Sequence, residues 1–434
     1  MIGIISSTEK DRRAAALARI RSRSVAFDEE LLSQVASIIN EVRRRGDAAL
    51  IDFTARFDGV QLRPDELPVG EETLRVAASQ VDERVLGALR EAINNVKAFH
   101  QRQVEESWEF TASPETKLGQ RITPVECAGV YVPGGTAAYP SSVVMNVVPA
   151  KVAGVERIVV ATPPRTLAEN PAVAATLLEL NVTEIYNIGG AQAVAALAFG
   201  TETVPRVDKI TGPGNKYVAA AKKLVFGQVG IDSIAGPSEV VIVADSSARA
   251  DFIAADLLAQ AEHAEDAAAV LLATSEELAR GVADEIKRQA EELPRRGIIA
   301  KSLGQYGAII VVDDLDEACA IINALAPEHL EILTRDEDAV AAKVRHAGAI
   351  FFGPFTPEVL GDYFAGPNHI LPTGGAARFS SALGVYDFVR RTSVLRYSRE
   401  AFSRAAEDIA TLAEAEGLAA HGRSALIRKQ YRER

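Results

Sequence analysis

The sequence predicts an α/β protein with parallel β-sheets in two domains and with helical segments at both ends of the chain. From about residue 120, short β-branched runs alternate with Ala-rich stretches, and such alternation is typical of parallel sheets. At about 100 to 200 residues per domain, a chain of 434 residues suggests two to four domains. The strand–helix units are too many for one open sheet of ordinary size, so two α/β domains are expected.

Eight runs have the composition of buried strands, because they are rich in Val, Ile and Leu and are bounded by turn residues. They are GVYVP (129–133), RIVVATPP (157–164), EIYNIGG (184–190), KITGPG (209–214), VVIVAD (240–245), AVLLATS (269–275), AIIVVDD (308–314) and HLEILT (329–334). The predicted helices between these strands are Ser141–Val148, Ala191–Phe199, Lys216–Phe226, Ala250–His263 and Leu315–Leu325.

The segments outside this region are predicted to be mostly helical. Apolar residues recur at helical spacing after Asp28, which is placed to cap the helix, and Gly46 is placed to end it. The segment Arg12–Arg23 has the composition of a charged arm rather than of a core helix. Near the C-terminus, Arg399–Glu416 carries apolar residues on one side only. This thin tail is therefore expected to dock on the body or on a second subunit.

Composition and charge exclude several classes of protein. The formal net charge is −12, whereas nucleic-acid-binding surfaces are basic. No stretch approaches the ~18 uninterrupted apolar residues of a membrane span, and the apolar run at the N-terminus is too short for a signal peptide. Cys127 and Cys319 have no Cys-x-x-Cys partner, so we expect buried, reduced thiols. We expect a cytoplasmic, soluble protein with no nucleic-acid or membrane partner.

Three glycine-rich turns follow predicted strands and open helices. Glycine lets backbone amides approach a phosphate, and a helix N-terminus favours its negative charge. None of the turns is the G-x-G-x-x-G fingerprint, and each alone is more often structural, but three within ~80 residues favour a nucleotide or dinucleotide cleft. Tyr131 lies at a strand end, and Gln192 and Asn215 could bond a ribose or nicotinamide. The turns are Val132–Gly135, Gly189–Gln192 and Gly212–Asn215.

Polar residues of the second half suggest a metal or acid–base site. Gln260 and His263 share a helix face and could bind zinc, although a capping or solvent-facing histidine is the commoner role. Glu328 and His329 follow a proline that ends a helix, and a histidine beside a carboxylate is a frequent general base. These patterns do not choose between a dehydrogenase and a hydrolase.

A polar, glycine-dense loop and the C-terminal tail contain the remaining candidates. The loop from Gly361 to His369 carries Asp362, which could complete a zinc site, and long irregular loops in compact domains are often functional. On spacing alone an ordinary surface loop is the commoner explanation. Glu416 and His421 near the C-terminus would on their own be interpreted as surface residues.

Long ordered runs of the chain resemble histidinol dehydrogenases nearly word for word, and the resemblance covers essentially the whole sequence. The runs are residues 131–155, 187–218, 235–245, 256–263, 327–332, 361–373 and 413–421. The resemblance implies the last steps of histidine biosynthesis, in which L-histidinol is oxidised to L-histidine through the aldehyde. The implied reaction reduces two NAD and consumes one water, on an enzyme that binds zinc.

The resemblance also implies roles for individual residues, and each position carries the residue type of the family. The implied zinc ligands are Gln260, His263, Asp362 and His421. The implied catalytic acid–base pair is Glu328 and His329. Further substrate contacts are expected from Ser238, His369 and Glu416, beside His329 and the zinc ligands. Contacts to NAD are expected from Tyr131, Gln192 and Asn215.

The family architecture comprises two incomplete Rossmann-like domains with small helical extensions at both ends. Carried over, the helical N-terminal arm is 1–25, the first domain is 26–130 with 238–382, the second domain is 131–237, and the helical C-terminal extension is 383–434. The extension is expected to reach the partner subunit of an obligate homodimer, so that Glu416 and His421 act across the interface.

Three other functions are considered. A paralogue of the same fold could oxidise another small alcohol, such as a sulfonated diol, but His369 together with Glu416 favours an amino-imidazole substrate. A zinc hydrolase could use Glu328 to activate water, but it would not need the three glycine turns. A non-catalytic binding protein is disfavoured because Glu328 and His329 are both intact.

Overall fold

The computed structural model describes residues 2–23, 27–113, 115–134 and 139–431. Gly135, the last residue of the first glycine turn, lies outside these ranges, as do residues 24 and 25 of the expected N-terminal arm. The chain divides into two compact units. One unit comprises Met1–Gln103 with Glu126–Phe388, and the other comprises Val104–Val125 with Val389–Arg434.

The first sheet of the larger unit has six parallel strands. Its order is β1 (Ile4–Ile5), β11 (Ala308–Val311), β10 (Ala268–Ala273), β9 (Glu239–Ala244), β12 (His329–Leu333) and β13 (Ala349–Phe352). The chain moves outward from β9 to β10 and β11 and then returns to β12 on the other side. Strands β9 and β12 therefore lie side by side at the point where the winding reverses, as in a doubly wound sheet.

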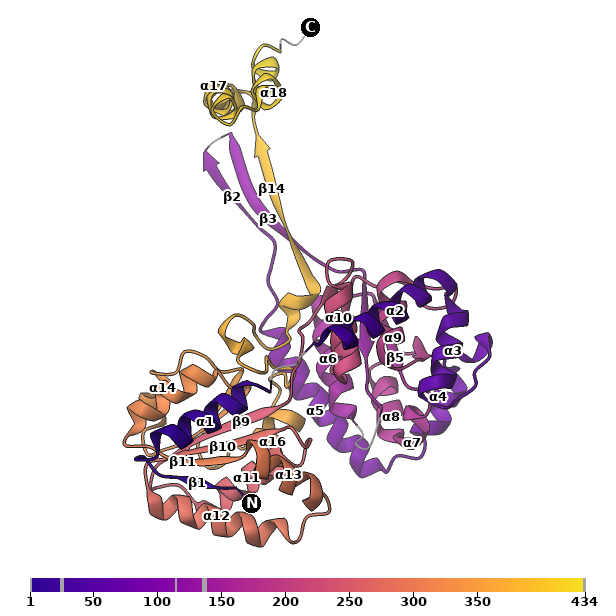
Figure 1. Cartoon of the computed structure of the whole chain (residues 1–434). Coiled ribbons are helices and arrows are strands. Elements are labelled where there is room, and N and C mark those ends of the chain that lie inside the picture. Colours follow the sequence, from indigo (N-terminus) through magenta and orange to yellow (C-terminus); the bar gives the residue numbers. More distant parts are fainter. Residues whose placement is uncertain (1, 24–26, 114, 135–138, 432–434) are drawn as a thin grey trace. The chain divides into compact units, whose positions relative to one another are not determined.

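Helices cover both faces of this sheet (Figure 1). On one face, α11 (Ala250–Ala261), α12 (Glu276–Ala290) and α13 (Arg296–Tyr306) pack on Val240 and Ile242. On the other face, α1 (Lys10–Arg21) and α14 (Leu315–Leu325) pack on Val241 and Val243. Successive residues of β9 thus point to opposite cores, as expected for a central strand with both faces buried.

The second sheet has five parallel strands. Its order is β6 (Ile185–Asn187), β5 (Arg157–Thr162), β4 (Cys127–Tyr131), β7 (Lys209–Thr211) and β8 (Gly230–Ile231). Helices α2 (Glu29–Arg45), α9 (Gly190–Phe199) and α10 (Lys216–Val225) contribute side chains to one core with it. The remaining α-helices of the larger unit are α3 (Asp47–Phe57), α4 (Glu71–Ala78), α5 (Glu83–Gln101), α6 (Pro140–Ala153), α7 (Thr166–Glu169), α8 (Pro171–Glu179), α15 (Glu337–Ala341) and α16 (Glu358–Tyr363).

The structure confirms the α/β class with parallel sheets and the local signals on which it was predicted. All eight predicted strands form, and Asp28 caps α2 by accepting a hydrogen bond from the backbone of Leu31, while Gly46 ends the helix. Cys127 and Cys319 are both buried and form no disulfide with each other. Among the helices in the described ranges, none has both the length and the apolar character needed to cross a membrane.

The prediction of a charged arm before residue 23 is wrong, because α1 is a core helix. Its residues Ala16, Leu17 and Ile20 are buried against the first sheet. The segment has many charged residues, and its apolar stripe consists of only three small or branched side chains. Composition alone therefore could not identify it as a core helix. Strand β1, just before the helix, pairs with β11 at the sheet edge.

The packing around α2 also differs from the expected domain division. Its buried residues Leu31, Val35 and Val42 share one core with the second sheet, and β4 is the central strand of that sheet. Residues 26–130, by contrast, were expected in the first domain. The amphipathic pattern of α2 identifies its buried face but does not identify the sheet on which that face packs.

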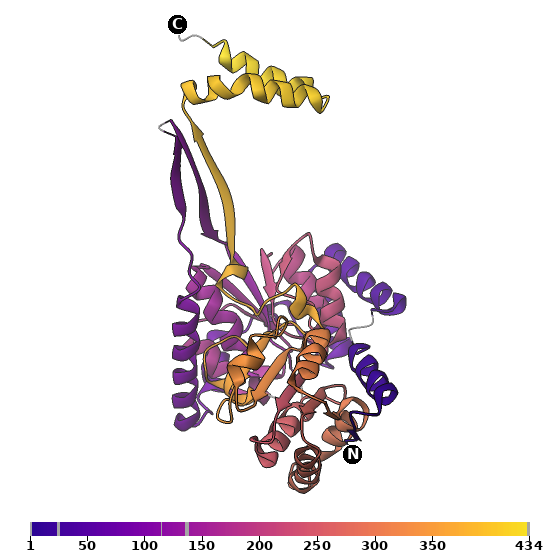
Figure 2. The same cartoon turned by 90° about the vertical axis from the view of Figure 1, so that its left-hand side faces the viewer.

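The smaller unit combines a three-stranded antiparallel sheet with two helices. Its strands are β2 (Trp108–Ser113), β3 (Thr116–Pro124) and β14 (Val389–Tyr397), and its helices are α17 (Arg399–Ala415) and α18 (Ala419–Lys429). The two helices lie side by side (Figure 2). The extension 383–434 was expected to be helical, so β14 is a correction. Most residues of β2 and β14 are exposed, and these strands therefore lack the apolar run of a buried strand.

Candidate active site

Two central strands of the first sheet bring Ser238 and Glu328 together at their amino ends. Ser238 directly precedes β9, and Glu328 directly precedes β12. Helix α14 ends at Leu325, and Ala326 adopts a left-handed conformation with φ of 50° before Pro327. The chain therefore turns sharply into β12, and Glu328 and His329 are both buried at the start of that strand.

The environment of His329 suits a neutral general base. Its Nδ1 lies 3.1 Å from the carbonyl oxygen of Glu239, which can only accept, so Nδ1 carries the proton. Burial lowers the pKa of His329 and favours the neutral imidazole. Among the described residues, none bonds to Nε2. The Nε2 lone pair is therefore available to take a proton from a ligand.

Glu328 is held by two donors from the neighbouring strand. The Ser238 hydroxyl donates to Oε2 at 2.5 Å, and the backbone N–H of Glu239 donates to the same oxygen at 3.0 Å. Burial nevertheless raises the pKa of Glu328 to about 8, because desolvation outweighs these hydrogen bonds. A carboxyl group in this environment can change its protonation state near neutral pH and so can act as an acid or as a base.

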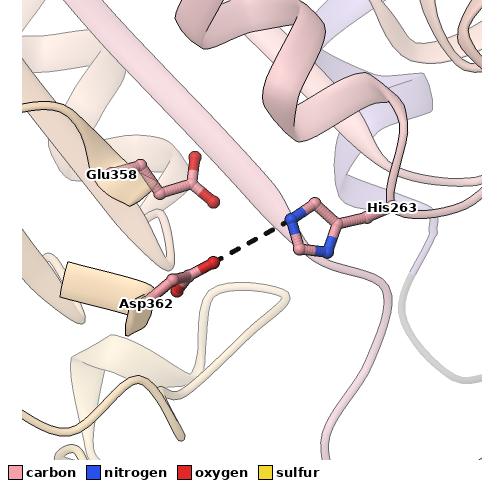
Figure 3. A group of neighbouring side chains, drawn as sticks. All are labelled: His263, Glu358 and Asp362. Carbon is pink, nitrogen blue, oxygen red and sulfur yellow. Dashed lines mark ion pairs between the residues drawn. The ribbon is translucent and has the colours of Figure 1, made fainter. Parts of the chain in front are cut away.

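A possible metal-binding group lies close to this pair. His263, Glu358 and Asp362 each offer a ligand atom, and these atoms lie within 4.8 Å of one another (Figure 3). His263 Nε2 is 4.0 Å from Asp362 Oδ2. Gln260 lies in the last turn of α11, one turn before His263, and is fully buried. The structure thus brings together three of the four expected zinc ligands, Gln260, His263 and Asp362.

His369 belongs to the same neighbourhood. Its Nδ1 lies 3.0 Å from the backbone carbonyl of Asp362 and 3.8 Å from the Asp362 carboxylate. Asp362 itself lies in the short helix α16 rather than in the polar loop expected from sequence. Helix α16 has only six residues, fewer than two turns, and is therefore too short to show a periodic pattern in a glycine-rich segment.

The remaining two residues expected at the zinc and the substrate belong to the smaller unit. Glu416 follows α17 as its C-terminal cap, and His421 lies in the first turn of α18. Both side chains are exposed within the single chain. Neither is part of the group formed by His263, Glu358 and Asp362.

A cavity of about 1210 Å³ opens at the carboxyl ends of the strands of the second sheet. Tyr131, Gln192 and Asn215 all line it. The Tyr131 hydroxyl accepts a hydrogen bond of 3.0 Å from the backbone N–H of Gly190. Asn215 caps α10 through Oδ1, which accepts from two backbone N–H groups, so its amide nitrogen is the part left to contact a ligand. The three residues expected at NAD thus share one cavity.

Gly212 explains why the third glycine turn can pass so close to Tyr131. Its φ is +114°, and a Cβ at this position would lie 2.1 Å from the carbonyl oxygen of Tyr131. Only glycine combines this backbone conformation with such a close approach. The glycine therefore packs the turn against the end of β4, beside the cavity.

The family model described as histidinol dehydrogenase matches residues 21–429, which is nearly the whole chain. The chain belongs to the histidinol dehydrogenase family. Membership identifies it as an oxidoreductase that acts on a small molecule.

Individual members of the histidinol dehydrogenase family agree closely with the chain. It is 55% identical to histidinol dehydrogenase of Geobacillus kaustophilus (strain HTA426) over 401 residues, which cover 92% of this chain and 94% of that protein. It is 50% identical to that of Syntrophotalea carbinolica over 428 residues, covering 99% of each. The crystal structure of histidinol dehydrogenase from Elizabethkingia anophelis superposes with a TM-score of 0.91 at 33% identity, covering 98% of each chain.

Glu358 is a candidate site residue of this family member that sequence analysis missed. Its side chain is 2% exposed, and burial raises its pKa well above the ordinary value. When the Gln260 amide nitrogen faces Glu358, it donates to Oε1 at 2.9 Å. Glu358 and Asp362 are four residues apart and so share one face of α16. This spacing is the sequence pattern from which Glu358 could have been predicted as a neighbour of Asp362.

Proposed function

We propose that this protein oxidises L-histidinol to L-histidine through L-histidinaldehyde, the last steps of histidine biosynthesis. One observation carries the proposal. The buried His329 has an Nε2 to which no described residue bonds, and its Nδ1 lies 3.6 Å from the carboxylate of Glu328 and 3.7 Å from that of Glu358 in the possible metal-binding group. Oxidation of an alcohol to an acid needs a base at the carbinol and a second group that activates water. His329 and Glu328 supply these two functions.

Zinc fits the residues at this place. An imidazole, an amide oxygen and a carboxylate are suitable zinc ligands, and the proposed set is Gln260, His263 and Asp362 with His421 of the partner subunit. The ligand atoms of His263 and Asp362 already lie within 4.8 Å of one another. When bound, zinc supplies a Lewis acid and a template for the imidazole and amine of the substrate, without redox chemistry of its own.

NAD fits the cavity at the second sheet. The volume of about 1210 Å³ suffices for a dinucleotide, and Tyr131, Gln192 and Asn215 present polar groups to it. The N-terminus of α9 begins at the Gly189–Gly190 turn and adds backbone donors that suit a phosphate. When bound, NAD accepts the hydride of each oxidation step.

The two catalytic residues act in turn on the substrate. Nε2 of His329 takes the proton of the alcohol as the first hydride leaves. Glu328, as a carboxylate, takes a proton from the water that adds to the aldehyde. His329 releases its first proton to solvent and then takes a proton from the hydrated aldehyde as the second hydride leaves. One water added, two hydrides transferred and three protons released account for the change from alcohol to carboxylate.

The substrate's polar groups match the surrounding residues. Ser238 and His369 lie around the possible metal-binding group, next to Glu328 and Asp362 respectively. Glu416 of the partner subunit is proposed to pair with the substrate ammonium. A substrate with an amine and an imidazole would use both His369 and the carboxylate of Glu416. This favours histidinol over a diol that contains no nitrogen.

We infer that the protein works as a homodimer with shared active sites. The smaller unit exposes large apolar side chains, which indicates an interface. They are Trp108, Phe110, Leu395, Leu412, Ile427 and Tyr431, each more than half exposed. With such a thin core of its own, this unit is expected to pack against a second copy. A cytoplasmic location, and the absence of nucleic-acid and membrane partners, remain predictions.

Mixed dimers test the shared site directly. A His329→Asn chain and a His421→Ala chain are expected to be inactive alone. If His421 acts across the interface, a statistical mixture regains about a quarter of wild-type activity, because half the dimers are mixed and each has one intact site. If His421 acts within its own subunit, mixing restores nothing. A fully active monomer in solution would also contradict the proposal.

The substrate is tested on a panel of alcohols. The zinc-loaded protein is expected to reduce NAD with L-histidinol at a kcat/KM far above that for other amino alcohols or a sulfonated diol. Preference for a non-imidazole alcohol would favour a paralogue of the same fold instead. Failure with every alcohol would remove the dehydrogenase proposal.

A further inference from the structure

A buried arginine from the N-terminal segment reaches the residues that hold the catalytic pair. Arg23 follows α1, and its side chain is only 3% exposed. Its Nε donates to the carbonyl of Ile20 at 3.1 Å. Its Nη1 donates to the carbonyls of Ser238 at 3.1 Å and Asp266 at 2.7 Å, and its Nη2 bonds to Oε2 of Glu239 at 2.5 Å. One guanidinium thus ties together three separate segments of the chain.

Two of the groups that Arg23 contacts belong to the residues that bond Glu328 and His329. Ser238 donates its hydroxyl to Glu328, and Glu239 donates its backbone N–H to the same carboxyl oxygen. The carbonyl of Glu239 lies against Nδ1 of His329. Within the part of the chain that the structure describes, the hydrogen bonds made by the side chains of the catalytic pair therefore come from the two-residue segment that Arg23 anchors.

The third contact connects Arg23 with the segment of the possible metal ligands. Asp266, whose carbonyl accepts from Nη1, lies three residues after His263 in the connection between α11 and β10. A shift of Arg23 would therefore release the starts of β9 and β10 together. Active-site geometry is sensitive to such shifts, since a displacement of about 1 Å can cost roughly 100-fold in rate.

Charge gives a second reason for an arginine here. Glu239 is buried beside Glu328, and two neighbouring buried carboxyl groups repel each other when both are ionised. Arg23 is the cation that pairs with Glu239 and also lowers the pKa of Glu328. A lysine could carry the charge, but it lacks the planar fork that bonds two carbonyls and a carboxylate at once.

We propose that Arg23 is a positioning residue of the active site, which holds Ser238 and Glu239 so that Glu328 and His329 keep their working geometry. The inference rests on the proposed function, because it assumes that Glu328 and His329 are the catalytic pair. Arg23 touches neither substrate nor cofactor in this proposal, and it acts through the start of β9.

A purely structural role for Arg23 would be to fasten α1 to the body, and the same helix provides a matched control. Arg13 pairs with Glu317 at 2.7 Å, and its side chain is 15% exposed. That ion pair also ties α1 to the body, but within the described residues neither Arg13 nor Glu317 forms a hydrogen bond or ion pair with β9. Loss of Arg13 therefore weakens the attachment of α1 without disturbing Ser238 or Glu239.

The test compares Arg23→Lys, Arg23→Met and Arg13→Met in the full-length, zinc-loaded protein. For each, kcat and KM with histidinol and NAD are measured beside zinc content and melting temperature. Arg23→Met is expected to lower kcat per zinc-loaded site at least about tenfold with both KM values little changed, and Arg23→Lys to lower it less. Arg13→Met is expected to lower the melting temperature with kcat unchanged.

A double variant keeps the test decisive if Arg23→Met does not fold. Arg23→Met with Glu239→Gln removes both buried charges, so the melting temperature is expected to recover while kcat stays low. Recovery of kcat to the wild-type value, or a loss that only follows zinc content, would overturn the proposal. If the wild-type protein itself makes no NADH from histidinol, the proposed function fails instead, which is a separate outcome.

Discussion

Nδ1 of His329 lies 3.1 Å from the carbonyl oxygen of Glu239, across the adjacent central strands β9 and β12. This contact fixes the tautomer of the imidazole, because a carbonyl can only accept a hydrogen bond. It also fixes the ring orientation, so Nε2 is the nitrogen left to act on a ligand. The parallel pairing of two buried strands therefore fixes the tautomer and the orientation of the proposed general base.

Replacement of His329 by Asn tests whether His329 is the general base. Asparagine keeps a polar side chain of smaller size but cannot take up a proton, so kcat is expected to fall by about 10² to 10⁴. Binding of histidinol, measured by calorimetry, is expected to persist. His346→Asn, outside the candidate site, is the control and should retain activity. Near-normal turnover of His329→Asn would remove His329 from the mechanism.

The rate should depend on the ionisation of Glu328. Burial raises the pKa of this carboxyl to about 8, and only its carboxylate form can take a proton from water. The overall rate is therefore expected to rise with pH through about 8, whereas His329, with its lowered pKa, is already neutral there. A pH profile of kcat for the wild type and for Glu328→Gln checks this. Glu328→Gln should lose most of its activity, and its kcat should no longer rise with pH near 8. If kcat of the variant still rises there, the ionisation belongs to another group.

Glu358 is expected to support metal binding through Gln260. Its carboxylate can accept from the Gln260 amide, and groups that orient metal ligands typically contribute 10- to 100-fold to affinity. Glu358→Gln should weaken zinc binding by roughly that factor in a chelator competition. Glu265→Gln, which removes an exposed carboxylate paired with Lys301, should leave the zinc affinity unchanged. Equal affinities in all three proteins would exclude Glu358 from metal binding.

Gln192 should affect NAD and not histidinol. It lines the cavity at the second sheet, and its side chain is almost fully buried at the start of α9. Gln192→Ala is expected to raise the KM for NAD several-fold, since it removes one polar contact worth about 1 kcal/mol. The KM for histidinol should stay the same. An effect on histidinol alone would mean that the cavity does not hold the dinucleotide.

The sequence was sufficient to predict the eight longer or more apolar strands of the two parallel sheets and their parallel direction, because buried parallel strands are continuous apolar runs. It could not reveal α1 as a core helix, since only Ala16, Leu17 and Ile20 of that charged segment are buried. The strands of the smaller unit were also missed, because exposed residues on β2 and β14 remove the usual alternation.

The candidate site was predictable only in part. Spacing identified Gln260 with His263 and Glu328 with His329, because each pair is close in sequence. Ser238 and Glu328 meet only through the pairing of β9 with β12, which connects residues 90 positions apart. Arg23 is more distant still, 215 positions from Ser238. Such contacts depend on tertiary packing, and a single sequence contains no local pattern for them.

The central claim is tested most directly by counting the NADH formed per histidinol consumed. Purified protein is incubated with limiting L-histidinol and excess NAD, before and after chelation and zinc add-back, and NADH is followed by absorbance. The proposed function predicts two NADH per histidinol, lost on chelation and restored by zinc. One NADH per histidinol would mean that oxidation stops at the aldehyde and would contradict the role given to Glu328. No NADH from the zinc-loaded protein would contradict the histidinol assignment itself.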